Sequence, residues 1–69
     1  MIRLRIREIA EAKGITMTDL SRMSDLDYRT VQAIFRNPYK KVTTLTLERM
    51  AKALGVAVAE LMEEVADKG

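Results

Sequence analysis

Apolar residues recur every three to four positions along most of the chain, which is the period of a helix that buries one face. Short polar segments, several of them containing glycine or proline, interrupt this pattern. The pattern indicates neither strand pairing nor internal repeats, and it predicts a single all-α domain over residues 1–69. The five expected helices cover residues 4–13, 17–23, 28–36, 44–54 and 58–66.

The first apolar stretch fits two kinds of secondary structure. Ile2, Leu4 and Ile6 alternate with arginines, which is the pattern of a short strand. Ile2 and Ile6 also lie on one helical face, and residues 8–13 are rich in helix-forming side chains. We therefore expect a helix from about Leu4, with Gly14 directly after its last turn.

Side chains that cap helix N-termini precede three of the expected helices. Thr16 comes three residues before Asp19, as in a capping box. Asp27 and Thr43 occupy the cap positions of the third and fourth helices. Ala57 precedes the fifth helix and has no side-chain acceptor, so the start of that helix is the least well defined.

The helical faces also define an expected core. Pro38 ends the third helix because proline lacks an amide donor, and Gly55 ends the fourth. A small chain without cysteines depends on an efficient apolar core for its stability. The residues expected inside are Leu20, Met23, Val31, Ile34, Phe35, Leu47, Met50, Ala51, Leu54, Val58, Leu61, Met62 and Val65.

The two expected helices between residues 16 and 37 are joined by a short turn at residues 24–26. Two short helices in this arrangement form a helix-turn-helix, whose second helix enters the major groove of DNA. Once Val31 and Ile34 are buried, one face of that helix remains for contacts with bases and phosphates. This face carries Arg29, Gln32, Ala33 and Arg36, with Tyr28 on its flank.

The charge distribution agrees with a nucleic-acid partner. Residues 1–41 carry nine Lys/Arg and five Asp/Glu, a balance of 9 − 5 = +4. Residues 42–69 carry three and five, a balance of 3 − 5 = −2. A basic first part and an acidic last part predict one surface that faces a polyanion and another that faces away from it.

Composition argues against several other classes of function. The chain has no cysteine and no histidine, which excludes disulfides and zinc fingers and leaves Ser21 and Ser24 without a histidine base. We expect no enzymatic activity, metal, cofactor or small-molecule ligand. No apolar run approaches the ~20 residues that span a bilayer, and the first residues do not form a signal peptide. We expect a cytoplasmic protein that is associated with the nucleoid when bound to DNA, and no membrane partner.

Several segments together resemble one known family. They are Lys13-Gly14-Ile15-Thr16, Asp19-Leu20-Ser21, Thr30-Val31, Ile34, the run from Thr46 to Val56, and Glu60-Leu61. Their order and spacing over most of the chain resemble the lambda-repressor-like, Cro/repressor (XRE) helix-turn-helix domains. This resemblance implies a compact five-helix domain that binds double-stranded DNA through its third helix, commonly as a homodimer on a two-fold site.

The resemblance also implies which residues contact DNA. The base-reading residues would be Tyr28, Arg29, Gln32 and Ala33. Thr18, at the start of the second helix, and Arg36, Asn37, Lys40 and Lys41 would contact phosphates. Arg29 and Gln32 could each contact either a base or a phosphate. Tyr28 could contact the sugar-phosphate backbone or pack within the protein.

The chain departs from the family pattern at three places. Asp25 occupies the turn position where the family usually has glycine, so we expect an aspartate in the left-handed conformation. Met17 stands where a glutamine often contacts the DNA backbone, which leaves that contact to Thr18 or to backbone amides. Ala10 and Phe35 replace an Arg–Glu pair, so we expect Phe35 to be buried near Ala10.

Two functions from different classes fit these observations. The first is sequence-specific binding of double-stranded DNA by a small transcriptional regulator. The second is a protein-interaction module with the same fold, such as an antitoxin-like protein or an adaptor. We expect no toxin-wrapping tail and no ligand-sensing domain after the fifth helix, which favours the first function. For the homodimer, we expect residues 55–57 and the fifth helix to form the contact surface.

Overall fold

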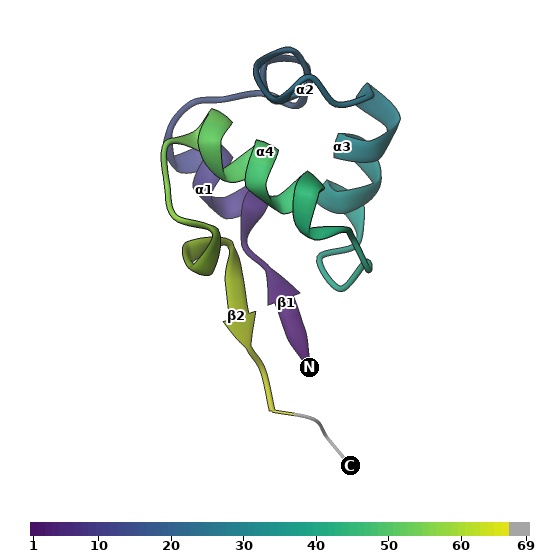
Figure 1. Ribbon diagram of the computed structural model, residues 1–69, viewed down its shortest axis with the longest axis vertical. Helices are drawn as coiled ribbons and strands as arrows, with labels where there is room; N and C mark the ends of the chain where they lie inside the picture. Colours follow the sequence, from purple (N-terminus) through teal and green to yellow (C-terminus); the bar gives the residue numbers. More distant parts are fainter. Residues whose placement is uncertain (67–69) are drawn as a thin grey trace.

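The computed structural model describes residues 1–66, which form a bundle of helices with a small two-stranded antiparallel sheet at one end (Figure 1). Its two strands come from opposite ends of the described chain, and the pair is called the hairpin below. The strands project from the bundle, and the described residues begin and end on that side. The elements are β1 (Ile2–Leu4), α1 (Ile6–Ala12), α2 (Met17–Ser24), α3 (Tyr28–Arg36), α4 (Thr44–Leu54), the 3-10 turn η1 (Val58–Leu61) and β2 (Met62–Glu64). No helix in this part of the chain is long and apolar enough to cross a membrane.

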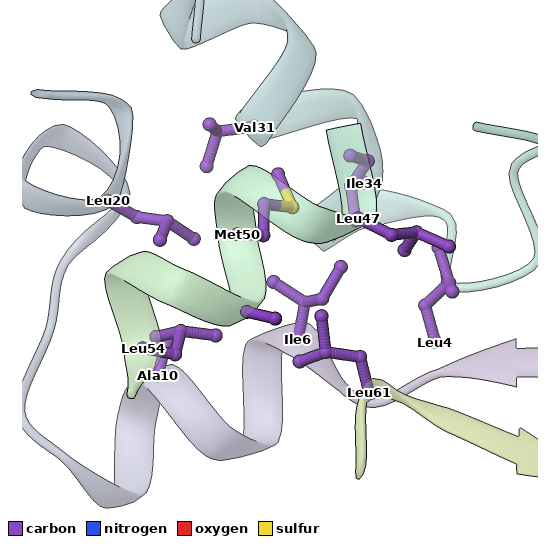
Figure 2. Packing of buried hydrophobic residues seen from close by; sticks show 11 residues of the cluster. Leu4, Ile6, Ala10, Leu20, Val31, Ile34, Leu47, Met50, Leu54 and Leu61 are labelled. Atoms are coloured by element: carbon purple, nitrogen blue, oxygen red, sulfur yellow. The ribbon is translucent and has the colours of Figure 1, made fainter. Parts of the chain in front are cut away.

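The core is built around α4. Met50 has no exposed surface and lies among side chains from α1, α2, α3 and η1 (Figure 2). Every surrounding element contributes at least one apolar side chain, so burial of this cluster holds the bundle together. The buried apolar residues are Leu4, Ile6, Ala10, Leu20, Val31, Ile34, Leu47, Met50, Ala51, Leu54 and Leu61.

Two of the three predicted caps are confirmed. The Asp19 amide donates to Thr16 Oγ1 over 3.1 Å, and the Thr16 amide donates to Asp19 Oδ2 over 3.3 Å, which completes the capping box. Thr43 Oγ1 accepts from the Thr46 amide over 3.2 Å. Asp27 holds the N-cap position of α3, but its side chain makes no capping hydrogen bond, so that part of the prediction is wrong.

The prediction of a fifth helix is wrong, and so is the prediction that no strands pair. The chain makes one 3-10 turn and then extends at Met62 (φ −116°, ψ 138°) into β2. β2 pairs antiparallel with β1, so that Ile2 lies opposite Glu64 and Leu4 opposite Met62. The poor cap at Ala57 and the available partner strand together explain why tertiary pairing prevails over the helical pattern. The fold is therefore mostly helical rather than all-α.

The pairing of β1 with β2 also decides between the strand and the helix that the first segment could form. The alternation of Ile2 and Leu4 with arginines marks a strand, and α1 begins at Ile6 rather than near Leu4. Glu63 faces Arg3 across the sheet, with an oxygen 3.7 Å from Arg3 Nη1 and 4.0 Å from Arg5 Nε. Opposite charges across the two strands favour this register.

Some residues expected in the core lie elsewhere. Met23 is 54% exposed, because Leu20 and Ser24 occupy the inward face of the short helix α2. Met62 is exposed, because β2 places it on the hairpin rather than on a buried helical face. Phe35, Val58 and Val65 are half-buried rather than fully buried.

Candidate DNA interface

The turn between α2 and α3 has a fixed geometry. Asp25 ends α2 in the left-handed conformation (φ 56°, ψ 37°), as expected, and its amide donates to the carbonyl of Ser21. The Leu26 amide donates to the same carbonyl over 3.1 Å, and the Ser21 hydroxyl donates to the Leu26 carbonyl. Arg49 of α4 adds a hydrogen bond to the Asp25 carbonyl over 3.3 Å. These contacts fix the direction in which the chain enters α3.

α3 is anchored by its inner face. Val31 and Ile34 are buried in the core (Figure 2), and the amides of Thr30 and Val31 donate to the Asp27 carbonyl. Phe35 lies at the edge of the core rather than inside it. It lines a groove between α1 and α3, so the expectation of a fully buried Phe35 is wrong.

The outer face of α3 carries the predicted base-reading residues. Arg29 and Arg36 are exposed, and Gln32 and Ala33 are half-exposed between them. The spacing of three, one and three positions places these four on a single stripe of the helix. Tyr28, at the first position of α3, is 40% exposed beside that stripe. The fold thus brings these five residues onto one side of one helix.

The loop after α3 continues the same basic surface. The Asn37 side-chain oxygen accepts from the Tyr39 amide over 3.1 Å, and the Asn37 carbonyl accepts from the Lys40 amide over 3.1 Å. Asn37 therefore shapes the loop. Its amide nitrogen has no partner in the described part of the chain. Lys40 and Lys41 are exposed.

The cations of this surface differ from those of the N-terminal segment. Arg29, Arg36, Lys40 and Lys41 form no ion pair with any residue between 1 and 66. In contrast, each arginine of the N-terminal segment has a glutamate partner: Arg3 pairs with Glu8 and Glu63, Arg5 with Glu63, and Arg7 with Glu11. The hydrogen bonds that the Arg3 guanidinium donates to the Glu8 carboxylate raise the pKa of Arg3. Four cations without a carboxylate partner in the described part of the chain therefore lie together on α3 and the following loop.

The start of α2 lies beside α3. Thr18 is exposed in the first turn of α2, whereas Met17 is half-buried against the core. A groove of about 580 Å³ separates the start of α2 from α3 and the outer side of α1. Its lining includes Arg7, Thr16, Met17, Gln32, Phe35 and Arg36.

Two residues of this surface were not among the predicted site residues. Arg7 lines the groove together with Gln32 and Arg36, and it also pairs with Glu11 over 3.3 Å. Arg49 fixes the turn from α4, 24 positions away in the sequence. Both depend on tertiary packing, for which no local pattern gives a signal.

Comparison with known proteins agrees with this geometry. Residues 5–67 match the model of the Cro/C1-type HTH DNA-binding domain. The chain is 33% identical over 60 residues to the SPbeta prophage-derived uncharacterized HTH-type transcriptional regulator YopO of Bacillus subtilis (strain 168), covering 87% of this chain and 84% of that protein.

A solved structure with a similar fold is the restriction-modification controller protein C.AhdI from Aeromonas hydrophila. The two share 30% sequence identity and a TM-score of 0.76, over 83% of this chain and 85% of that one. The family match covers nearly the whole chain and includes the α2–turn–α3 unit described above. This chain therefore belongs to the Cro/C1-type helix-turn-helix family of DNA-binding domains.

Proposed function

We propose that this chain is a sequence-specific regulator of transcription that inserts α3 into the major groove of double-stranded DNA. The observation that carries the proposal is the stripe of α3 formed by Arg29, Gln32, Ala33 and Arg36, which is accessible and has no ion-pair partner within residues 1–66. One relative is described as a transcriptional regulator and the other as a controller protein, which supports the same role. The protein acts by binding at the nucleoid in the cytoplasm and catalyses no reaction.

The residues of the stripe have different roles. Arg29, in the first turn of α3, donates to O6 and N7 of guanine, a contact worth about 1–3 kcal/mol of base discrimination. Gln32 pairs in the same way with N6 and N7 of adenine. Ala33 is small enough to let the helix approach the base edges and to contact a thymine methyl group. Tyr28 packs against the sugar-phosphate edge of the groove.

Phosphate contacts position the domain on the duplex. Arg36, Lys40 and Lys41 provide charge, while Thr18 and Asn37 provide neutral donors on either side of α3. The charged contacts release condensed cations, so affinity depends steeply on salt concentration.

The proposed complex contains two copies of the chain. One domain of this size contacts few base pairs, and a second copy doubles the number that are read. Two copies related by a two-fold axis place their α3 helices in successive major grooves, with half-sites about 10 base pairs apart. The operator is then an inverted repeat.

Selection of bound sites from a pool of random duplexes tests the proposal directly. We expect an inverted repeat with half-sites about one helical turn apart. The affinity of a selected duplex is then compared with that of a scrambled duplex at several salt concentrations. If no duplex is enriched and binding does not depend on salt, the protein-interaction module with the same fold replaces this proposal.

A further inference from the structure

We propose that a second copy of this chain packs onto the groove between the hairpin and the loop at residues 39–42, and that this groove is the dimer surface. The inference rests on the proposed function, because it supplies the contact that function requires. This groove replaces the dimer surface expected from the sequence, which was residues 55–57 together with the fifth helix. Residues 58–64 form a 3-10 turn and a strand instead of that helix, and Val56 packs against the protein's own core.

The groove has a volume of about 580 Å³ and a mostly apolar lining. Leu4 and Leu47 form its buried floor. Ile2, Tyr39 and Met62 line its sides and are 46%, 45% and 38% exposed. Large apolar side chains exposed singly are ordinary, but here several gather around one hollow, as in surfaces that bind another protein.

Charge on either side of the groove indicates that the occupant is another copy of the same chain. Lys40 and Lys41 line the groove on the loop side, and within residues 1–66 they form no ion pair. Glu64 lies two residues after Met62 in β2, so both project from the same face of the hairpin. Its carboxylate lies 3.2 Å from the amino group of Met1 and is 74% exposed, so it is accessible to a second cation. A two-fold rotation brings the glutamate of each copy to Lys41 at the edge of the other copy's groove, leaves Lys40 free for phosphate, and places the apolar side chains together at the centre. The face is thus self-complementary, as a two-fold interface must be.

The face of the hairpin fits a second copy better than its edge does. The outer edge of β2 has backbone groups that point away from β1, which is the usual template for adding a strand. Antiparallel pairing of two β2 strands about Glu63, however, would place the two Glu63 side chains directly opposite one another. Like charges directly opposite each other destabilise a strand pair, and Glu63 already pairs with Arg3 and Arg5.

The position of the groove suits a complex on DNA. The Leu4 amide donates to the Pro38 carbonyl over 2.7 Å, so the hairpin is attached to the loop that directly follows α3. A dimer formed through this groove therefore has its two basic loops near the two-fold axis and one α3 helix on each side. This is the arrangement that two adjacent half-sites require.

Sedimentation equilibrium of the full chain without DNA, at concentrations up to the millimolar range, tests the surface. Met62→Lys and Ile2→Lys should each weaken self-association at least tenfold. Met23→Lys is the matched control, because Met23 is more accessible than Met62 or Ile2 but lies on α2, at the opposite end of the bundle (Figure 1). Circular dichroism verifies folding, and Tyr39→Ser in the loop replaces any hairpin variant that fails to fold. A Met62→Lys protein that associates like wild type, or a control that weakens it equally, would overturn the proposal.

Charge exchange tests the orientation of the two copies. Glu64→Lys alone and Lys41→Glu alone should each weaken self-association, and the double variant should restore it. Each single change places two like charges opposite one another if residues 41 and 64 meet across the interface. The double variant then places opposite charges there again. Failure of the double variant to recover would overturn the proposed two-fold arrangement.

A third measurement separates this inference from the proposed function. Met62→Ser leaves the net charge unchanged, so its affinity for a 10-base-pair random duplex should equal that of wild type. On a selected two-site duplex it should lose cooperativity. A wild-type chain that remains monomeric both alone and on the two-site duplex, yet binds DNA in a salt-dependent manner, would overturn the dimer surface only. A chain that dimerises through the groove but binds no duplex would overturn the proposed function only.

Discussion

The guanidinium of Arg49 donates a hydrogen bond over 3.3 Å to the backbone carbonyl of Asp25, the left-handed residue that ends α2. This contact joins the central helix α4 to the turn that sets the angle between α2 and α3. Because the carbonyl belongs to the backbone, the contact constrains the path of the chain whatever side chain residue 25 carries. The orientation of α3 is therefore controlled in part from α4.

Replacing Arg49 with methionine should lower the free energy of unfolding by about 0.5–1 kcal/mol, because one exposed hydrogen bond is lost. The change also allows the turn between α2 and α3 to adopt other conformations. The loss of binding free energy on the selected duplex should therefore exceed the loss of free energy of unfolding. Lys52→Met on the same helix is the control, since it removes an exposed charge that makes no hydrogen bond to this turn. Urea denaturation and a binding titration measure the two effects, and equal behaviour of the two variants would contradict the role of Arg49.

Asp25→Gly should raise the free energy of unfolding by about 1 kcal/mol, because glycine adopts φ 56° without the steric cost that a Cβ imposes. The Asp25 side chain makes no hydrogen bond or ion pair within residues 1–66, and glycine keeps the carbonyl that Arg49 contacts. Binding to the selected duplex should be unchanged. A lower denaturation midpoint would show that the aspartate side chain contributes something that glycine cannot replace.

Phe35→Ala should cost about 1.5–2.5 kcal/mol, roughly half of the 3–5 kcal/mol typical of a fully buried aromatic side chain. Phe35 is half-buried and lines the groove between α1 and α3, so only part of its surface leaves water on folding. Ile34→Ala, at a buried position of the same helix, should cost more. The order of the two thermal midpoints checks this, and a larger loss at Phe35 would mean that its ring is central to the core.

The helices were predictable where a local signal and the tertiary fold agree. Thr16 with Asp19, and Thr43, mark the starts of α2 and α4 because the capping contacts are made within three residues of each other. The buried positions Val31 and Ile34 follow from helical spacing alone. The outward face of α3, with Arg29 and Arg36 at its ends, follows from the same spacing. What each of these residues contacts in DNA stays a prediction.

The hairpin was not predictable in the same way. Val58, Leu61, Met62 and Val65 recur at helical spacing, and only pairing with β1, about 60 positions away in the sequence, turns the second half of that segment into a strand. Met62 changes from an expected core residue to an exposed one as a result. The groove beside it likewise exists only because the loop and both strands meet in three dimensions.

The salt dependence of DNA binding should identify the phosphate contacts. If Arg36, Lys40 and Lys41 each neutralise one phosphate, a plot of log affinity against log salt concentration has a slope of about −2.7 per copy of the chain. Arg36→Ala should weaken binding to all sequences alike and make the slope shallower by about one. Arg29→Ala should instead cost about 1–3 kcal/mol on the selected site and relax the preference at one base pair. A slope near zero for the wild-type chain would contradict the assignment.

The most direct test of the central claim is the affinity of Ala33→Glu for the selected duplex. Ala33 lies in the middle of the outward stripe of α3, so a longer, negatively charged side chain there would meet the base edges and phosphates. Ala59→Glu, at an exposed position of η1, adds the same charge away from α3 and should bind like wild type. A folded Ala33→Glu protein, verified by its thermal melt, should show no specific binding. If it binds the selected duplex as tightly as wild type does, α3 does not read DNA in this protein.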